Sequence, residues 1–258
     1  MPYVDVGSAK LWYEDTGSDA TPVVLLHPYT GNTEGWIYQL PVFTAAGYRC
    51  ITYDRRGWGK SHNGSPGSEK TYATDDLHAL VEHLGLPRYH LVSSGGGGYV
   101  ALDHTVSHPE ELLSLVVACS GGPLQNDPEY MAIGSKYGRI LGFQSLPAWF
   151  RELGPTYRNA DPNGVDRWVE IEKASRQGES SQEGIKNAFT LDLLATIQVP
   201  TLMIAGSADL YAAPPRMRAM ASRIPDCRFA LMPEAGHAAF WEQPEQWNEL
   251  VLDFIRDH

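Results

Sequence analysis

The sequence predicts an α/β protein with one mostly parallel, twisted sheet flanked by helices. Short continuous apolar runs, typical of strands buried on both faces of a parallel sheet, alternate with amphipathic helical patterns. Four successive glycines, 95–98, join one such run to the helical pattern that follows it. The length of 258 residues, 43% of them hydrophobic, suits a single domain with one sizeable core.

The chain begins with a predicted antiparallel hairpin, because residues 2–15 alternate in polarity about Gly7-Ser8. This hairpin should form one edge of the sheet. Two buried strands are then expected at 22–27 and 47–54. The second strand leads into a turn at 55–61, which is rich in basic residues and glycine.

The middle of the chain continues the alternation. A helix with an apolar face that includes Leu77 and Leu80 should end at Gly85, since glycine readily adopts the conformation that closes a helix. Residues 90–102 then predict a strand, a tight turn and a helix, because glycine lacks the Cβ that forbids positive φ and close backbone approach. Another buried strand is expected at 112–119.

Strand and helix cease to alternate between residues 121 and 189. Short helical patterns with many aromatic residues are interrupted there by prolines. The alternation resumes with a buried strand at 199–206, a helix at 214–224 and a last strand at 228–232. A final helix should follow Pro244.

Charge and cysteine content indicate which binding partners and which cellular compartment to expect for this protein. A net charge of −11 argues against binding to nucleic acid or to an anionic membrane surface. The three cysteines lie in apolar runs without metal-ligand spacing, as expected of buried thiols in a reducing compartment. The N-terminus lacks the pattern of an export signal, and no apolar run is long enough to span a bilayer. We therefore expect a cytoplasmic protein.

The segment 90–102 resembles the nucleophile elbow G-x-S-x-G of the α/β-hydrolase superfamily, in which a strained turn between strand and helix presents a serine. Aligned with that pattern, Gly95 takes the place of the nucleophilic serine. A shift of one residue would make Ser94 the nucleophile, at the cost of misaligning the strand end and the small residue of the helix. A glycine-rich loop without chemistry, or a dinucleotide-binding turn, is the alternative interpretation.

Further motifs resemble the same superfamily. Residues 54–61 read Asp-x-x-Gly-x-Gly-x-Ser, a turn found at this point in α/β-hydrolases. The resemblance places the catalytic acid at Asp209 and the histidine at His237, in the chain order typical of the fold. It also implies an oxyanion hole made by the backbone N–H groups of Tyr29 and Gly96, although the strand before Tyr29 ends in His-Pro instead of the usual His-Gly.

The resemblance also implies a helical cap over the active site. We predict a hydrolase core at 1–120 and 190–258, with the cap inserted at 121–189. One or two of three aromatic residues in the cap should face the substrate: Tyr130, Trp149 and Tyr157.

The function predicted from the resemblance is hydrolysis of an ester, a lactone or the C–C bond of a ketone by a Ser-His-Asp mechanism. Because Gly95 cannot act as a nucleophile, the leading hypothesis is a hydrolase inactivated by replacement of its serine. A serine-less lyase, cyclase or hydratase that uses the Asp209–His237 pair, and a non-catalytic protein that binds a small ligand, remain alternatives. We expect a small apolar or aromatic substrate and no cofactor, and leave a homodimer open.

A metal site is not expected. His104 and His108 have the spacing of metal ligands on one helix face, but we expect no third ligand near them. His78 and His83 lie five apart on another predicted helix and so face different directions.

Overall fold

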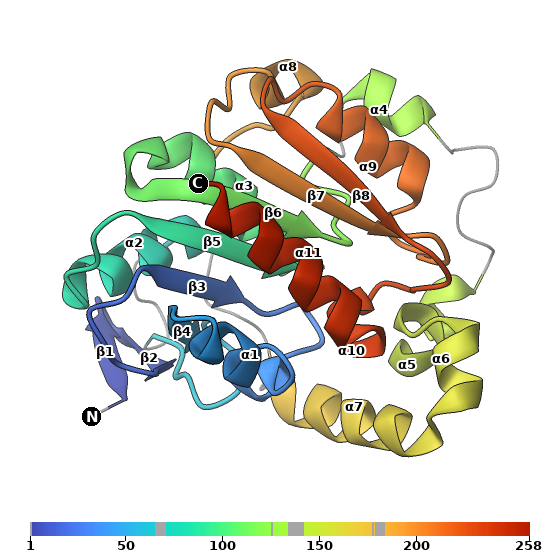
Figure 1. The fold of residues 1–258 in the computed structure, drawn as a ribbon, viewed down its shortest axis with the longest axis horizontal. Helices are drawn as coiled ribbons and strands as arrows, with labels where there is room; N and C mark the ends of the chain where they lie inside the picture. The colour runs from blue at the N-terminus through green and yellow to red at the C-terminus, as the bar shows by residue number, and fades with distance from the viewer. Residues whose placement is uncertain (1, 65–70, 125, 134–141, 177, 179–183) are drawn as a thin grey trace.

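A computed structural model describes residues 2–64, 71–124, 126–133, 142–176, 178 and 184–258. Its centre is an eight-stranded sheet in the order β1-β2-β4-β3-β5-β6-β7-β8 (Figure 1). The strands are β1 (Tyr3–Val6), β2 (Ala9–Asp15), β3 (Pro22–Leu26), β4 (Arg49–Tyr53), β5 (Tyr89–Ser94), β6 (Leu112–Ala118), β7 (Thr201–Gly206) and β8 (Cys227–Met232).

The sheet is parallel from β3 to β8, and only β1 and β2 run antiparallel to their neighbours. The central strand β5 lies between β3 and β6, with Leu91 aligned with Val24 and Leu115. Strands β3, β5 and β7 are buried at every position, as expected when helices cover both faces of a parallel sheet. The carboxyl ends of the parallel strands therefore meet at one edge, where α/β folds place their ligand sites.

Helices cover both faces of the sheet and divide the core into two apolar clusters. One cluster lies beneath α2 (Ala73–His83), α3 (Gly97–Ser107), α8 (Leu191–Leu194) and α9 (Pro214–Ala221). The other lies beneath η1 (Thr33–Trp36), α1 (Leu40–Ala45), α10 (Ala239–Glu242) and α11 (Pro244–Arg256), with α1 and α11 in front of the sheet in Figure 1. The short helix η2 (Pro109–Glu111) joins α3 to β6.

Between β6 and β7 the chain forms an additional group of short helices. They are α4 (Pro128–Ala132), η4 (Phe143–Ser145), α5 (Ala148–Glu152), α6 (Pro155–Ala160) and α7 (Pro162–Ser175). Figure 1 shows α5, α6 and α7 on the side toward which β3 and β5 point. The predicted cap coincides in part with these helices, while residues 125, 134–141, 177 and 179–183 of that segment lie outside the described residues. Its division from the core stays a prediction.

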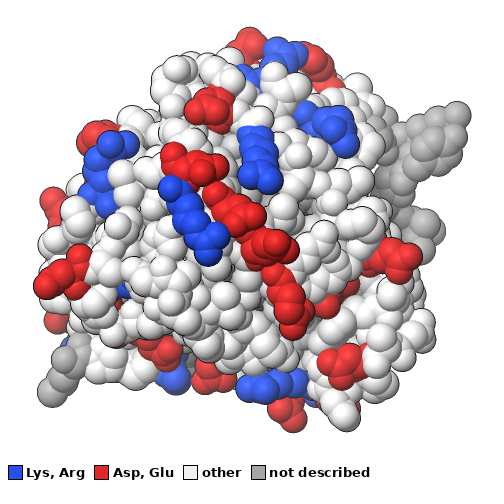
Figure 2. Space-filling view, viewed as in Figure 1, with Lys and Arg blue, Asp and Glu red and all other residues white. Residues whose placement is uncertain are grey.

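The surface agrees with the acidic composition. Figure 2 shows a row of acidic side chains along α11, where Glu245, Glu249 and Asp253 are exposed. In the part of the chain that the structure describes, no helix is long and apolar enough to cross a membrane.

The predicted α/β class with one mostly parallel sheet flanked by helices is confirmed by this topology. The expected hairpin forms β1 and β2, with Gly7 at φ +57° between them. The predicted helix before Gly85 is α2, and Gly85 itself has φ +57°. The sequence analysis missed η1 and α1, which are short, with Pro41 in the first turn of α1.

Candidate active site

The glycine-rich turn forms a sharp connection between β5 and α3. Gly95 has φ +53°, a conformation that residues with a side chain rarely adopt. Its N–H donates to Ala118 O (3.0 Å), and its own carbonyl accepts from Gly98 N (3.0 Å). A Cβ on Gly97 would lie 2.4 Å from Leu26 O, so only glycine lets α3 approach β3 this closely. The backbone alone thus fixes the direction in which position 95 faces.

Position 95 faces the imidazole of His237. A Cβ placed on Gly95 would lie 3.1 Å from His237 Nε2 and 3.0 Å from Pro28 Cβ. These contacts are tight, so His237 and Pro28 would have to move by a few tenths of an ångström to admit a side chain.

Asp209 holds the other nitrogen of His237. Asp209 follows β7 and its side chain is fully buried, while His237 lies in the loop between β8 and α10. His237 Nδ1 donates to Asp209 Oδ2 (2.9 Å), and Tyr211 N and Ala212 N donate to Oδ1 (2.7 and 2.9 Å). Because the carboxylate only accepts hydrogen bonds, this arrangement assigns the proton on Nδ1 and turns Nε2 toward Gly95.

Two backbone N–H groups lie beside the turn. Tyr29 N would be 3.1 Å from a Cβ on Gly96, so the two residues are in close contact. Neither Tyr29 N nor Gly96 N donates a hydrogen bond to another described residue. The side chain of Tyr29 is 46% exposed and its ring packs edge-on against Trp58. The residues predicted for an oxyanion hole therefore lie together next to Gly95, with donors available to a ligand.

Two buried carboxyl groups that the sequence analysis missed also face this site. Glu152 O accepts from His237 N (2.7 Å), and Thr30 Oγ1 donates to Glu152 Oε2 (2.6 Å). Glu242 accepts from Gly154 N and Gly236 N (2.9 and 3.0 Å). Glu152 reaches the site only through the tertiary contact between α5 and the His237 loop, and no sequence motif marks it. Glu242 follows His237 closely on the chain, in a Glu-x-Pro pattern that resembles the end of this loop in α/β-hydrolases.

These acidic groups determine the protonation of His237. Burial lowers the pKa of the imidazole, but the carboxylate of Asp209, followed by Glu152 and Glu242, outweighs burial and raises the pKa to about 9. Burial also raises the pKa of Glu152, and it raises the pKa of Glu242 to about 7 despite hydrogen bonds from Gly236 and Gly154. At neutral pH the charged imidazolium of His237 is therefore favoured.

Ser94, the alternative nucleophile, lies at the end of β5 and is buried. Its Oγ has no hydrogen-bond partner among the described residues. The contacts of His237 Nε2 point instead to the neighbouring position 95.

The three aromatic residues predicted to face the substrate lie in different places. Tyr130 is 3% exposed and its hydroxyl donates to Gly121 O (2.5 Å). Tyr157 is partly buried with its hydroxyl near Asp161, and Trp149 packs edge-on against Phe150 at the surface. No described contact joins any of the three to His237, so their role in binding stays a prediction.

The ring that does contact His237 is Tyr211, with centroids 4.8 Å apart. Its hydroxyl accepts from Arg151, which comes from α5. The sequence analysis did not single out Tyr211, although it follows Asp209 by two residues.

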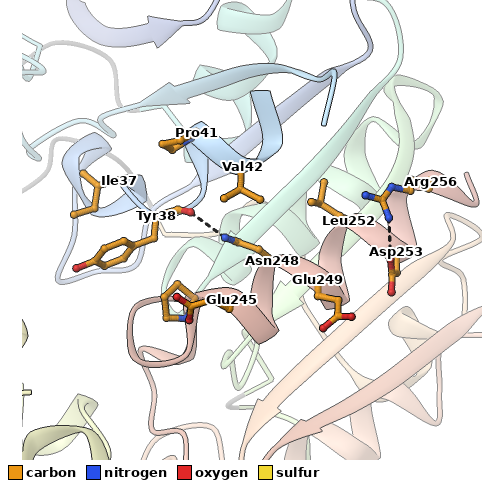
Figure 3. Close-up of a pocket in the computed structure, with 11 residues that line it drawn as sticks. Ile37, Tyr38, Pro41, Val42, Glu245, Asn248, Glu249, Leu252, Asp253 and Arg256 are labelled. Carbon is orange, nitrogen blue, oxygen red and sulfur yellow. Dashed lines mark hydrogen bonds and ion pairs between the residues drawn. The ribbon is translucent and has the colours of Figure 1, made fainter. Parts of the chain in front are cut away.

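A groove of about 660 Å³ lies elsewhere, between α1 and α11 on the outer face. Figure 3 shows apolar side chains from α1, including Val42, facing Leu252 of α11, and a hydrogen bond from Asn248 to Tyr38 O. The groove contains neither Gly95, nor Asp209, nor His237, and we do not assign the chemistry to it.

A second group of histidines and a carboxylate lies at the amino ends of the strands. It comprises His78, His104, His108 and Glu111, here called the histidine cluster. The expectation that no third ligand stands near His104 and His108 is therefore wrong. Glu111 follows His108 by three residues, at the end of η2, and His78 is brought to them by the packing of α2 against α3.

Comparison with known proteins shows that most of the chain matches one family. Residues 23–250 match the model of the alpha/beta hydrolase family. The chain is 27% identical to a 2-hydroxy-6-oxononadienedioate/2-hydroxy-6-oxononatrienedioate hydrolase of Paraburkholderia phymatum, over 95% of this chain and 91% of the relative.

Solved structures agree with this match. A thermophilic esterase from Thermogutta terrifontis superposes with a TM-score of 0.80 at 26% identity, covering 96% of this chain and 94% of the esterase. A bromoperoxidase from Bacillus anthracis superposes with a TM-score of 0.75 at 25% identity, covering 96% of both chains.

Proposed function

Because this chain belongs to the alpha/beta hydrolase family, we propose that its site is a Ser-His-Asp hydrolase site in which Gly95 replaces the nucleophilic serine. The reaction for which this site is built is hydrolysis of an ester, a lactone or a ketonic C–C bond. The esterase and the C–C hydrolase among its relatives support the first and last of these. This chain itself is then a disabled hydrolase.

One observation carries the proposal: the Cβ position of Gly95 lies 3.1 Å from His237 Nε2. A serine hydroxyl is one bond beyond that Cβ, and so would be within hydrogen-bond reach of the imidazole. Asp209 holds the opposite nitrogen at 2.9 Å, which is the arrangement that orients a histidine for proton transfer.

Each residue then has a defined role in the serine-bearing form. His237 accepts the serine proton and returns it to the leaving group, while Asp209 fixes the tautomer and stabilises the imidazolium. The N–H groups of Tyr29 and Gly96 donate to the oxyanion of the tetrahedral intermediate. With glycine at position 95 the covalent step is lost, and only the ~10³ to 10⁴-fold acceleration over water that positioning and the oxyanion hole supply is expected.

A serine-less reaction is the second candidate, because Asp209, His237 and the N–H groups of Tyr29 and Gly96 are arranged without a hydroxyl at position 95. In its unprotonated form His237 would remove a proton next to a substrate carbonyl, the two N–H groups would stabilise the resulting enolate, and the imidazolium would then return the proton. A lyase, cyclase or hydratase would use these steps without a nucleophilic side chain from the protein.

The test compares Gly95→Ser with Gly95→Ala on 4-nitrophenyl acetate and dihydrocoumarin. Both variants add the same Cβ at φ +53° and should lose similar stability, about 1–3 kcal/mol. Only Gly95→Ser should gain turnover, by several orders of magnitude, and react covalently with a fluorophosphonate probe.

The opposite result is equally informative. No gain in a folded Gly95→Ser variant would contradict the proposal. Ser94→Ala would then show whether Ser94 is the nucleophile, and consumption of the ligand by the unmodified chain would separate a serine-less enzyme from a binding protein.

A further inference from the structure

We propose that the histidine cluster is a binding site for a divalent transition-metal ion, with Zn²⁺ as the best match, in which His78, His108 and Glu111 are the ligands. One nitrogen or oxygen atom from each of these three residues lies within 4.8 Å of the others. Two imidazoles and one carboxylate are a donor set that zinc accepts in three-ligand protein sites.

The three ligands come from three different segments that converge at the amino ends of β5 and β6. His78 belongs to α2, His108 directly follows α3, and Glu111 ends η2. His78 Nδ1 lies 2.5 Å and His108 Nδ1 lies 3.6 Å from the same oxygen, Glu111 Oε1. The imidazole rings of His78 and His108 stack with centroids 4.2 Å apart and planes 13° apart. Because stacked rings direct their in-plane lone pairs side by side, one of the two imidazoles would turn about its Cβ–Cγ bond so that both nitrogens face one ion.

The carboxylate of Glu111 is oriented for this role. Its other oxygen, Oε2, accepts from His104 Nε2 (3.0 Å) and from Tyr89 Oη (3.2 Å). His104 is fully buried, and its Nδ1 lies 3.2 Å from Thr74 Oγ1, which fixes the ring. Oε2 is thus occupied by buried donors, and Oε1 is the oxygen presented to His78 and His108.

The second ring nitrogen of His78 also has a carboxylate neighbour. Glu82 Oε1 lies 3.6 Å from His78 Nε2, one helical turn along α2. Metal-bound histidines commonly donate their second N–H to a carboxylate, which fixes the ring and makes the coordinating nitrogen more basic. The side chains of His78, His108 and Glu111 retain 35%, 18% and 15% exposure, so solvent can supply a fourth ligand.

An ion at this place would join α2 to the segment between α3 and β6. It lies at the opposite ends of the strands from Gly95 and His237, so its expected effect is on stability. An ion that binds the folded chain and not the unfolded one raises the melting temperature.

The experiment titrates tag-free, chelator-treated protein with ZnCl₂ by calorimetry, and with CoCl₂ by visible absorbance. One equivalent of each ion should bind, with cobalt absorbance that indicates nitrogen and oxygen ligands, and zinc should raise the melting temperature. His78→Ala and His108→Ala should each weaken zinc binding at least about tenfold. His83→Ala, on the same helix but outside the histidine cluster, is the matched control and should bind like the unmodified chain.

Two results would overturn the proposal. One is the absence of stoichiometric binding by the unmodified chain, which needs no variant to fold. The other is loss of binding in His237→Ala with full binding in His78→Ala, which would place the ion at the Asp209–His237 pair instead.

Discussion

The two groups of histidine and carboxylate side chains lie at opposite ends of the same parallel strands and are built in inverse ways. At the carboxyl ends, one imidazole, His237, faces the acidic groups of Asp209, Glu152 and Glu242. At the amino ends, one carboxylate, Glu111, contacts three imidazoles. The first arrangement surrounds one imidazole with carboxyl groups, and the second surrounds one carboxylate with imidazoles. From the same residue types we therefore expect proton transfer at one end and, as proposed above, cation binding at the other.

The largest difference is expected when a carboxylate is changed to an amide in each of the two groups, at the carboxyl ends and at the amino ends of the strands. In a Gly95→Ser background, Asp209→Asn should lower kcat about 10³ to 10⁴-fold, because the amide no longer holds the catalytic tautomer of His237. Glu111→Gln in the same background should leave kcat unchanged. Steady-state ester hydrolysis measures both, and equal losses would contradict the separation of the two groups.

The pH dependence should show how strongly the acidic groups act on His237. Its pKa is raised to about 9, and the reaction requires the unprotonated base, so activity is low below the pKa and increases with pH. In Gly95→Ser, kcat/KM should therefore rise roughly tenfold per pH unit from pH 7 and level off near 9. A profile that levels off below pH 7 would show that the acidic groups do not control the imidazole.

The stability of the metal-free protein should depend on the hydrogen bonds of Glu111 at the amino ends of the strands. Glu111→Gln should cost about 1–3 kcal/mol in the free energy of unfolding, because the buried donors of His104 and Tyr89 lose a charged acceptor. Glu110→Gln changes an exposed neighbour and is the control. Urea denaturation with chelator present measures the difference, and equal stabilities would show that these hydrogen bonds contribute little.

The smallest expected effect comes from Glu152. Asp209 accepts a hydrogen bond from the side chain of His237, whereas the carboxyl group of Glu152 acts on His237 through its charge alone. The contribution of Glu152 to the raised pKa of His237 is therefore smaller. Glu152→Gln in the Gly95→Ser background should move the pH profile toward lower pH and change the plateau little. A shift toward higher pH would contradict this assignment.

The sequence predicted those parts of the molecule that depend on local chemistry. The turn at Gly95, the loop positions of Asp209 and His237, and the buried strands each follow from a short motif or an apolar run. The helices of the hydrolase core were also predicted where glycine or proline marks an end, as at Gly85.

The features that were missed arise only from packing. Glu152 reaches the His237 loop from α5, which is far from that loop in the sequence. His78 and Glu111 are separated by 33 positions, and their contact exists only because α2 packs against α3. Neither contact has a spacing that sequence patterns could reveal, whereas Glu242 follows His237 closely on the chain.

The turn at Gly95 keeps its shape without any side chain, because it is held by hydrogen bonds to Ala118 and from Gly98. Glycine and serine codons can differ by a single nucleotide. The loss or return of a hydroxyl at this position would therefore leave the surrounding architecture in place. In evolutionary terms, the role proposed for position 95 would place the chain one mutational step from a different catalytic state, which selection would reach without first rebuilding the fold.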